Sequence, residues 1–151
     1  MFSPNSPSLL VFQQSTGFSF SLKSLQRENE FHPRAGQIQA LAVNQETNDL
    51  VATTSRGTAV LFRFSAGPEP DSRNAFSQIA TTCVAAKAGL VAVGGEDGVV
   101  QIMRIIDGRL YSCTALLGHG VKNQVGIRSV AWGNTGELVS CGGDGTIRVW
   151  R

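Results

Sequence analysis

Residues 118–151 read GHGVKNQVGIRSVAWGNTGELVSCGGDGTIRVWR. After a Gly-His pair the stretch holds three short apolar runs, which are Ile127 to Trp132, Leu138 to Cys141 and a last run that ends in Trp150. A glycine-bearing turn separates the first two runs, and an Asp-Gly turn separates the last two. Short apolar runs bounded by tight turns predict three antiparallel strands in this part of the chain.

The same arrangement recurs toward the N-terminus. Glycines of small turns follow one another at intervals of 40, 41 and 47 residues, at Gly17, Gly57, Gly98 and Gly145. A large apolar residue stands five positions after each of them, at Leu22, Phe62, Met103 and Trp150. No segment of ten or more residues has helical periodicity, whereas short β-branched and small apolar runs recur between turn signals. The sequence therefore predicts an all-β fold built from a repeated module of forty-odd residues, a period typical of propeller blades.

The stretch that begins at Gly118 resembles the WD-repeat family, whose signature is a Gly-His pair that opens each unit and a Trp near its end. In that family four side chains form one hydrogen-bonded chain inside a blade, and the matching residues here are His119, Ser140, Asp144 and Trp150. Neighbouring blades cover both faces of a blade, so a buried Trp150 needs an acceptor for its indole N–H, which Ser140 offers. His119 is then expected to accept from the serine hydroxyl and to donate to Asp144, whose carboxylate also caps backbone N–H groups of its turn.

The resemblance implies a partial β-propeller of about three and a half four-stranded antiparallel blades. After a disordered lead-in over residues 1–8, the units are expected at residues 9–35, 36–78, 79–117 and 118–151. In the third unit, the positions of Asp144, Ser140 and Trp150 hold Asp97, Val93 and Met103. In the second unit, they hold Arg56, Ala52 and Phe62. In the first unit, Thr16 replaces the Asp. Only the last unit can therefore form the full hydrogen-bonded chain. Since propellers of this family usually close with about seven blades, we expect a longer propeller, or closure with a second chain.

The His, Ser and Asp of the last unit also have the composition of a hydrolase triad. Ser140 is predicted to lie inside a strand, and no G-x-S-x-G surrounds it, which favours a structural role. The glycine-rich stretches 94–98 and 142–145 precede strands instead of a helix, which favours hairpin turns over phosphate loops. We therefore expect no enzymatic activity, no metal site and no cofactor.

Composition narrows the classes of partner. The net charge is +2, and the 13 basic residues are scattered singly, so no specific nucleic-acid partner is expected. The N-terminus lacks the pattern of a signal peptide, and no apolar run reaches the ~18 residues of a transmembrane helix. Three cysteines, Cys83, Cys113 and Cys141, show no C-x-x-C spacing and are expected to be buried apolar residues in a reducing compartment. These features predict a soluble protein of the cytoplasm or the nucleus.

The resemblance implies a non-catalytic scaffold that binds other proteins in a multiprotein complex. Residues in turns and at strand starts are the candidates for contact with a partner, namely Arg56, Glu96, Lys122, Asn123, Gln124 and Arg128. An alternative is a phosphoinositide-binding, membrane-associated propeller, to which residues 50–64 are faintly similar, although the adjacent arginine pair of that class is absent from this sequence. A third hypothesis is a propeller of the replisome-adaptor type, from a faint likeness in residues 50–82.

Overall fold

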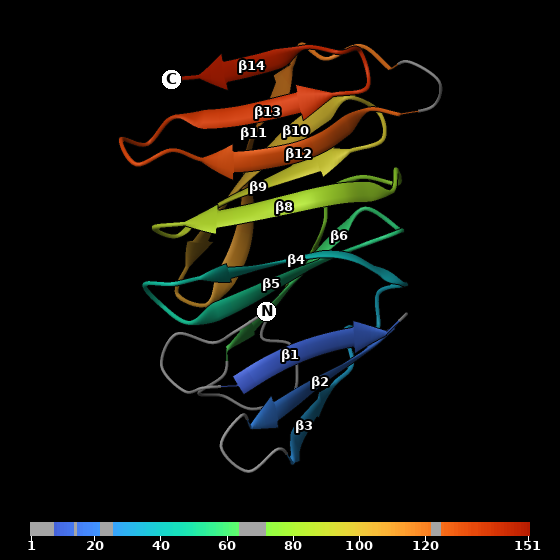
Figure 1. Ribbon diagram of the computed structural model, residues 1–151, viewed down its shortest axis with the longest axis vertical. Helices are drawn as coiled ribbons and strands as arrows, with labels where there is room; N and C mark the ends of the chain where they lie inside the picture. The colour runs from blue at the N-terminus through green and yellow to red at the C-terminus, as the bar shows by residue number, and fades with distance from the viewer. Residues whose placement is uncertain (1–7, 14, 22–25, 64–71, 122–124) are drawn as a thin grey trace.

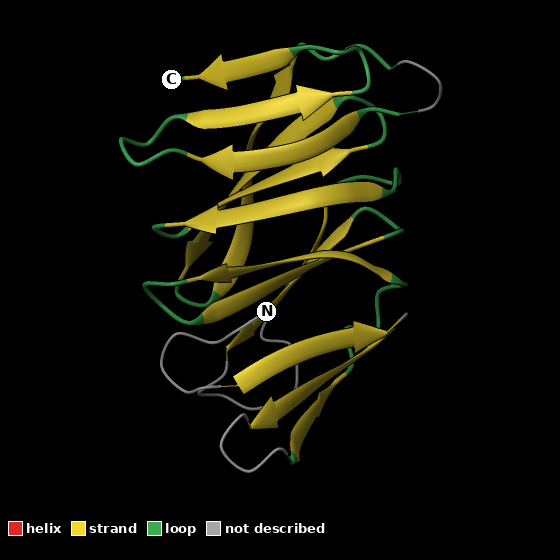
Figure 2. Cartoon of the chain, viewed as in Figure 1, coloured by secondary structure: helices red, strands yellow, loops and turns green. Residues whose placement is uncertain are grey.

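The structure is a computed structural model, and it describes residues 8–13, 15–21, 26–63, 72–121 and 125–151. Within these ranges the chain forms strands, turns and loops, and Figure 2 shows strands throughout and no helix. The all-β prediction is confirmed. The described residues contain no helix long and apolar enough to cross a membrane. Residues 1–7, which hold most of the predicted disordered lead-in, lie outside the described residues.

The strands form four antiparallel sheets, which we call blades 1 to 4. Blade 1 holds β1 (Ser8–Gln13), β2 (Thr16–Ser21) and β3 (Arg27–Phe31). Blade 2 holds β4 (Ile38–Asn44), β5 (Asp49–Thr54), β6 (Thr58–Arg63) and β7 (Ser72–Ala75). Blade 3 holds β8 (Thr81–Lys87), β9 (Leu90–Gly95), β10 (Val99–Ile106) and β11 (Arg109–Leu117). Blade 4 holds β12 (Ile127–Trp132), β13 (Leu138–Gly142) and β14 (Ile147–Trp150).

The blades follow one another along the long axis of the molecule (Figure 1). In blades 2 to 4 the first strand lies at one edge of its sheet, and these inner strands contact each other in turn, β4 with β8 and β8 with β12. Sheets that meet through their inner strands and stack face to face are the arrangement of propeller blades. The chain is a partial β-propeller.

The hydrophobic core lies in the layers between blades. Phe31 of blade 1 packs on Phe62 of blade 2 with perpendicular rings whose centroids are 5.6 Å apart. Val51 and Met103 belong to the layer between blades 2 and 3, and Ile127 belongs to the layer between blades 3 and 4. Each blade is thus stabilised by burial against its neighbours, as in other repeat proteins.

The repeated glycines occupy the same turn in three blades. Gly57, Gly98 and Gly145 have φ values of +68°, +81° and +80°, a region that L side chains rarely adopt. In each turn the glycine N–H donates to the carbonyl oxygen three residues earlier, at 3.2 Å. Gly17 differs, because it lies inside β2, paired with Phe12 and Phe31, and not in a turn. The alignment of the first copy with the other three is therefore wrong at this residue.

Two further expectations fail for the same reason, namely position on an outer strand. The sequence predicts a loop over residues 65–74 and an outer strand from Ala75 to Gln78, but β7 begins at Ser72, ends at Ala75 and pairs with β6. It is held by side chains too, since Asn74 Nδ2 donates to the Leu110 carbonyl at 3.0 Å. Cys113 was expected to be buried, yet it lies on the exposed strand β11. Outer strands face solvent, so residue polarity there does not follow the pattern of the core.

Candidate interaction surface

The structure brings together the four residues that the WD-repeat resemblance singles out in blade 4. Trp150 Nε1 lies 2.9 Å from Ser140 Oγ, and Ser140 Oγ lies 2.8 Å from His119 Nε2. The other ring nitrogen, His119 Nδ1, lies 3.2 Å from Asp144 Oδ1. β13 carries Ser140 and β14 carries Trp150, while His119 comes from the connection between β11 and β12. The contacts therefore join three segments of the chain across one blade.

The direction of the hydrogen bonds follows from the donor of the indole. Trp150 Nε1 can only donate, so Ser140 Oγ accepts from it and gives its own hydrogen to His119 Nε2. Nδ1 of the same ring is then the protonated nitrogen and donates to Asp144. The pKa of the Asp144 carboxyl lies well below its usual range, because the Thr146 backbone N–H, the Gly120 backbone N–H and the histidine side chain all donate to the carboxylate. The negative charge of Asp144 therefore lies at one end of this chain of hydrogen bonds.

This geometry gives no access for a substrate. Ser140 is only 1% exposed, and the side chain of His119 has no exposed surface. A nucleophilic serine must reach a substrate carbonyl beside donors for the oxyanion. The buried hydroxyl of Ser140 is already engaged by Trp150 and His119, which favours a structural role.

Blades 2 and 3 have apolar residues in place of Ser140 and Trp150 but keep a side-chain acceptor in the turn. Val93 and Met103 of blade 3 are buried apolar residues, as are Ala52 and Phe62 of blade 2. In the β9–β10 turn of blade 3 this acceptor is Asp97, whose Oδ1 accepts from the Val99 N–H at 3.1 Å.

In blade 2 the turn acceptor is a residue that the sequence reasoning missed. Thr54 Oγ1 accepts from the N–H groups of Arg56 and Thr58, each at 3.3 Å. A threonine that ends a strand before a Ser-Arg-Gly turn was the available signal, since threonine hydroxyls often cap such turns. The side chain of Arg56 therefore takes no part in the hydrogen bonds of this turn.

Three of the predicted partner-binding residues lie on one rim of the molecule. In blades 2, 3 and 4 a backbone hydrogen bond joins the turn between the second and third strands to the residue just before the first strand. The bonds run from Ser55 N to Gln37 O, from Glu96 N to Ala80 O and from Gly143 N to Gly126 O, at 2.8, 3.0 and 2.7 Å. We call this side, made of the β5–β6, β9–β10 and β13–β14 turns and the first residues of β4, β8 and β12, the entry rim. Arg56 and Glu96 stand on its turns and Arg128 on its strand starts, and all three are exposed.

A β-bulge marks the entry rim of every described inner strand. The registers shift between Ile38 and Ala40, between Thr81 and Cys83, and between Ile127 and Ser129. Arg128 is the extra residue of the third bulge, and bulges re-aim side chains near functional sites. The remaining candidates, Lys122, Asn123 and Gln124, lie outside the described residues.

The repeat assignment now has support from comparison with known proteins. A family model described as "WD domain, G-beta repeat" matches residues 111–151. Residues 111–151 are thus a WD repeat. The match begins inside β11 and runs through β14, so the WD repeat as a sequence unit joins the outer strand of blade 3 to the three strands of blade 4.

A curated relative covers almost the whole chain. The protein named "Ribosome biogenesis protein BOP1" of Giardia intestinalis is 26% identical over 164 aligned residues, which include 95% of this chain and 22% of that protein. The chain spans about a fifth of the length of the relative it matches.

Proposed function

We propose that this WD-repeat chain is a non-catalytic scaffold that binds other proteins in a complex of ribosome biogenesis. The observation that carries the proposal is the entry rim. Arg56, Glu96 and Arg128 are exposed there, and no hydrogen bond or ion pair joins their side chains to another described residue. Charged side chains that have no intramolecular partner are free to pair with a second protein, where they set orientation and specificity.

Two further observations support this function. The buried Ser140 offers no accessible nucleophile, which favours binding over catalysis. The name of the Giardia relative supports a function in ribosome biogenesis. Of the two expected compartments, cytoplasm and nucleus, this function favours the nucleus. Arg56 and Arg128 share the rim with the exposed acids Glu96 and Asp97, and this mixed charge fits a protein surface better than a uniformly anionic membrane.

Affinity purification from the cells that make this protein tests the proposal. The tagged chain is compared with the double variant Arg56→Ala and Arg128→Ala, and co-purified proteins are identified by mass spectrometry. We expect ribosome assembly proteins with the unaltered chain and at least a tenfold loss of them with the double variant. Arg109→Ala is the matched control, since Arg109 is an exposed arginine on β11, away from the entry rim. Equal recovery with the double variant, or the absence of assembly proteins, contradicts the proposal.

A further inference from the structure

A small cavity lies at the entry rim, where the connection from blade 2 to blade 3 meets the β9–β10 hairpin. Its volume is about 90 Å³, and its lining includes Phe76 and Ile79 of the connection and Asp97 and Gln101 of the hairpin. We call it the hairpin pocket. Pockets for small molecules usually have volumes of about 300–1,000 Å³. The hairpin pocket is therefore of a size for one side chain of a partner protein.

The two polar side chains of the hairpin reach the pocket because of their positions on and before β10. Met103 packs in the layer between blades 2 and 3, whereas Val100 and Ile102 pack in the layer between blades 3 and 4. Side chains on a strand alternate between its two faces, so Gln101 lies on the same face as Met103, toward blade 2. Asp97 stands in the turn just before this strand. Both residues line the same cavity.

The pocket holds a negative charge that solvent can reach. Asp97 is exposed, and its Oδ1 accepts from the Val99 N–H at 3.1 Å, which leaves Oδ2 for a ligand. No ion pair joins Asp97 to another described residue, and no lysine or arginine of the described chain lines the pocket. Gln101 is half-buried, and its amide has no hydrogen bond to the described residues. These two free acceptors favour a cationic donor.

The other wall of the pocket is apolar and held in place. The N–H groups of Phe76 and Ser77 both donate to the Gly57 carbonyl oxygen, at 3.2 and 3.3 Å, which ties this wall to the β5–β6 turn. Ser77 Oγ accepts from the Ile79 N–H at 2.9 Å. Phe76 is half-buried and Ile79 is 42% exposed. Surface of this kind packs against the methylene groups of a long charged side chain. A wall that is already fixed also lowers the entropic cost of binding.

Arginine fits these features better than lysine. A guanidinium carries five N–H groups in a planar fork, so it can donate to Asp97 and to Gln101 without the two acceptors meeting at one point. Its plane can also stack on an aromatic ring, which Phe76 supplies. The ammonium of lysine has its three N–H groups on a single atom, so its acceptors must converge.

We propose that the hairpin pocket binds an arginine side chain of a protein partner, with the guanidinium on the Asp97 carboxylate and the methylene groups against Phe76 and Ile79. The inference rests on the proposed scaffold function and adds one chemical feature of the partner. Its test uses a defined peptide, so a negative result removes the pocket and leaves the Arg56 and Arg128 contacts of the entry rim to their own experiment.

NMR titration of the isotope-labelled 151-residue chain tests the proposal. The probes are a capped Gly-Gly-Arg-Gly-Gly peptide and two versions with lysine or citrulline at the centre, citrulline being a neutral isostere of arginine. We expect the arginine peptide to shift the backbone amides of Asp97 and Val99 and the side-chain amide of Gln101. It should bind at least fivefold more tightly than the citrulline peptide and at least twofold more tightly than the lysine peptide.

Variants of the pocket locate the binding site. Asp97→Asn keeps an acceptor for the Val99 N–H but removes the charge, and it should lower the affinity for the arginine peptide at least fivefold. Gln101→Leu replaces the amide with an apolar side chain and should lower this affinity at least twofold. Asp107→Asn is the matched control, since Asp107 is an exposed acid in the β10–β11 turn, at the other end of β10.

The NMR spectrum of each variant shows whether it is folded, and if Gln101→Leu is not, Asp97→Asn decides. Equal affinity for the arginine peptide and either of the other two overturns the proposal. So do shifts confined to other parts of the chain, absence of binding, or unchanged binding by folded Asp97→Asn.

Discussion

Replacing Ser140 with alanine removes one hydroxyl that serves two neighbours. Ser140 Oγ accepts from Trp150 Nε1 at 2.9 Å and lies 2.8 Å from His119 Nε2. The serine is 1% exposed and the histidine side chain is fully covered, so water cannot replace the lost group. The substitution therefore leaves the half-buried donor of Trp150 and the buried acceptor of His119 without a partner.

The size of the effect follows from these two losses. An unsatisfied buried polar group costs about 1–3 kcal/mol. Trp150 is half-buried and should contribute near the lower end of that range, whereas His119 has no exposed side chain and should contribute more. We expect Ser140→Ala to lower the free energy of unfolding by about 2–4 kcal/mol.

Urea unfolding followed by tryptophan fluorescence measures this change, since both tryptophans, Trp132 and Trp150, lie in blade 4. Ser129→Ala is the matched control, because Ser129 is an exposed serine on the neighbouring strand β12. We expect the control to change the free energy of unfolding by no more than about 0.5 kcal/mol. If the two variants unfold at the same urea concentration with the same slope, Ser140 is not part of a stabilising network.

Three other predictions follow from named contacts. Because the pKa of Asp144 is depressed in the folded chain, its contribution to the free energy of unfolding is present above the ordinary carboxyl pKa and is lost as the pH falls. The urea midpoint should therefore fall more steeply between about pH 5 and pH 2 in the unaltered chain than in Asp144→Asn. Equal pH dependence of the two midpoints would contradict this. Gly145→Ala meets no atom within 4 Å and should cost about 1–2 kcal/mol for its φ alone, whereas Gly98→Ala adds a Cβ only 2.6 Å from a carbonyl oxygen and should cost more in the same urea assay. Thiol labelling with Ellman's reagent at pH 8 should modify the exposed Cys113 first, since burial raises the pKa of the Cys83 thiol, and mass spectrometry that finds Cys83 labelled as fast would refute it.

The fold was predictable where the signal is local. A glycine at positive φ is required by the turn itself, so Gly57, Gly98 and Gly145 recur at blade-like intervals whatever packs around them. Gly17 obeys the interval but lies within a strand, because the pairing of β2 with β1 and β3 overrides the turn signal. The polar strand β7 likewise exists through its pairing with β6, which no local pattern encodes.

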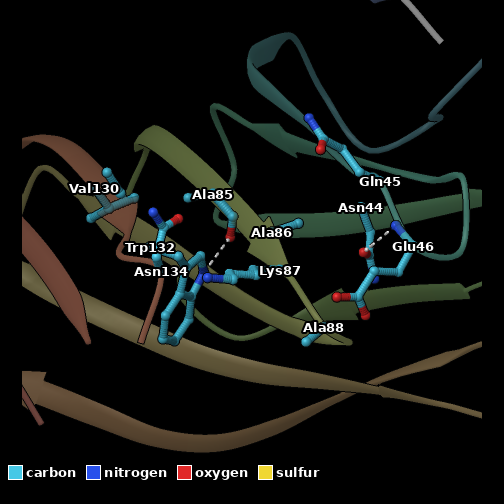
Figure 3. A pocket seen from close by; sticks show the side chains of 11 residues that line it. Asn44, Gln45, Glu46, Ala85, Ala86, Lys87, Ala88, Val130, Trp132 and Asn134 are labelled. Carbon is cyan, nitrogen blue, oxygen red and sulfur yellow. Dashed lines mark hydrogen bonds between the residues drawn. The ribbon is translucent and has the colours of Figure 1, made fainter. Parts of the chain in front are cut away.

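The entry rim was predictable in part, and the cavity of about 470 Å³ at the ends of β4, β8 and β12 (Figure 3) was not. Arg56 and Glu96 could be assigned to exposed turns from Gly and Asp spacing alone. That cavity is lined by Asn44, Lys87 and Trp132 among others, which are far apart in the sequence and line one cavity only because inner strands of successive blades pack together. Each of them reads in isolation as an ordinary strand-end residue, so only tertiary packing reveals the shared cavity.

Among blades 2 to 4, the hydrogen-bonded chain occurs in the blade whose third strand is least buried. Phe62, Met103 and Trp150 occupy equivalent registers, each opposite the first or second residue of the preceding strand, but the first two are fully buried and need no polar partner. β14 exposes Ile147 and Val149 at 74% and 54%, so hydrophobic burial stabilises this strand less than it stabilises β6. A directional polar network that ties β14 to β13 and to the preceding loop offsets that deficit. Blades 2 and 3 can therefore lose the network and keep the fold, because Phe62 and Met103 are buried between neighbouring blades.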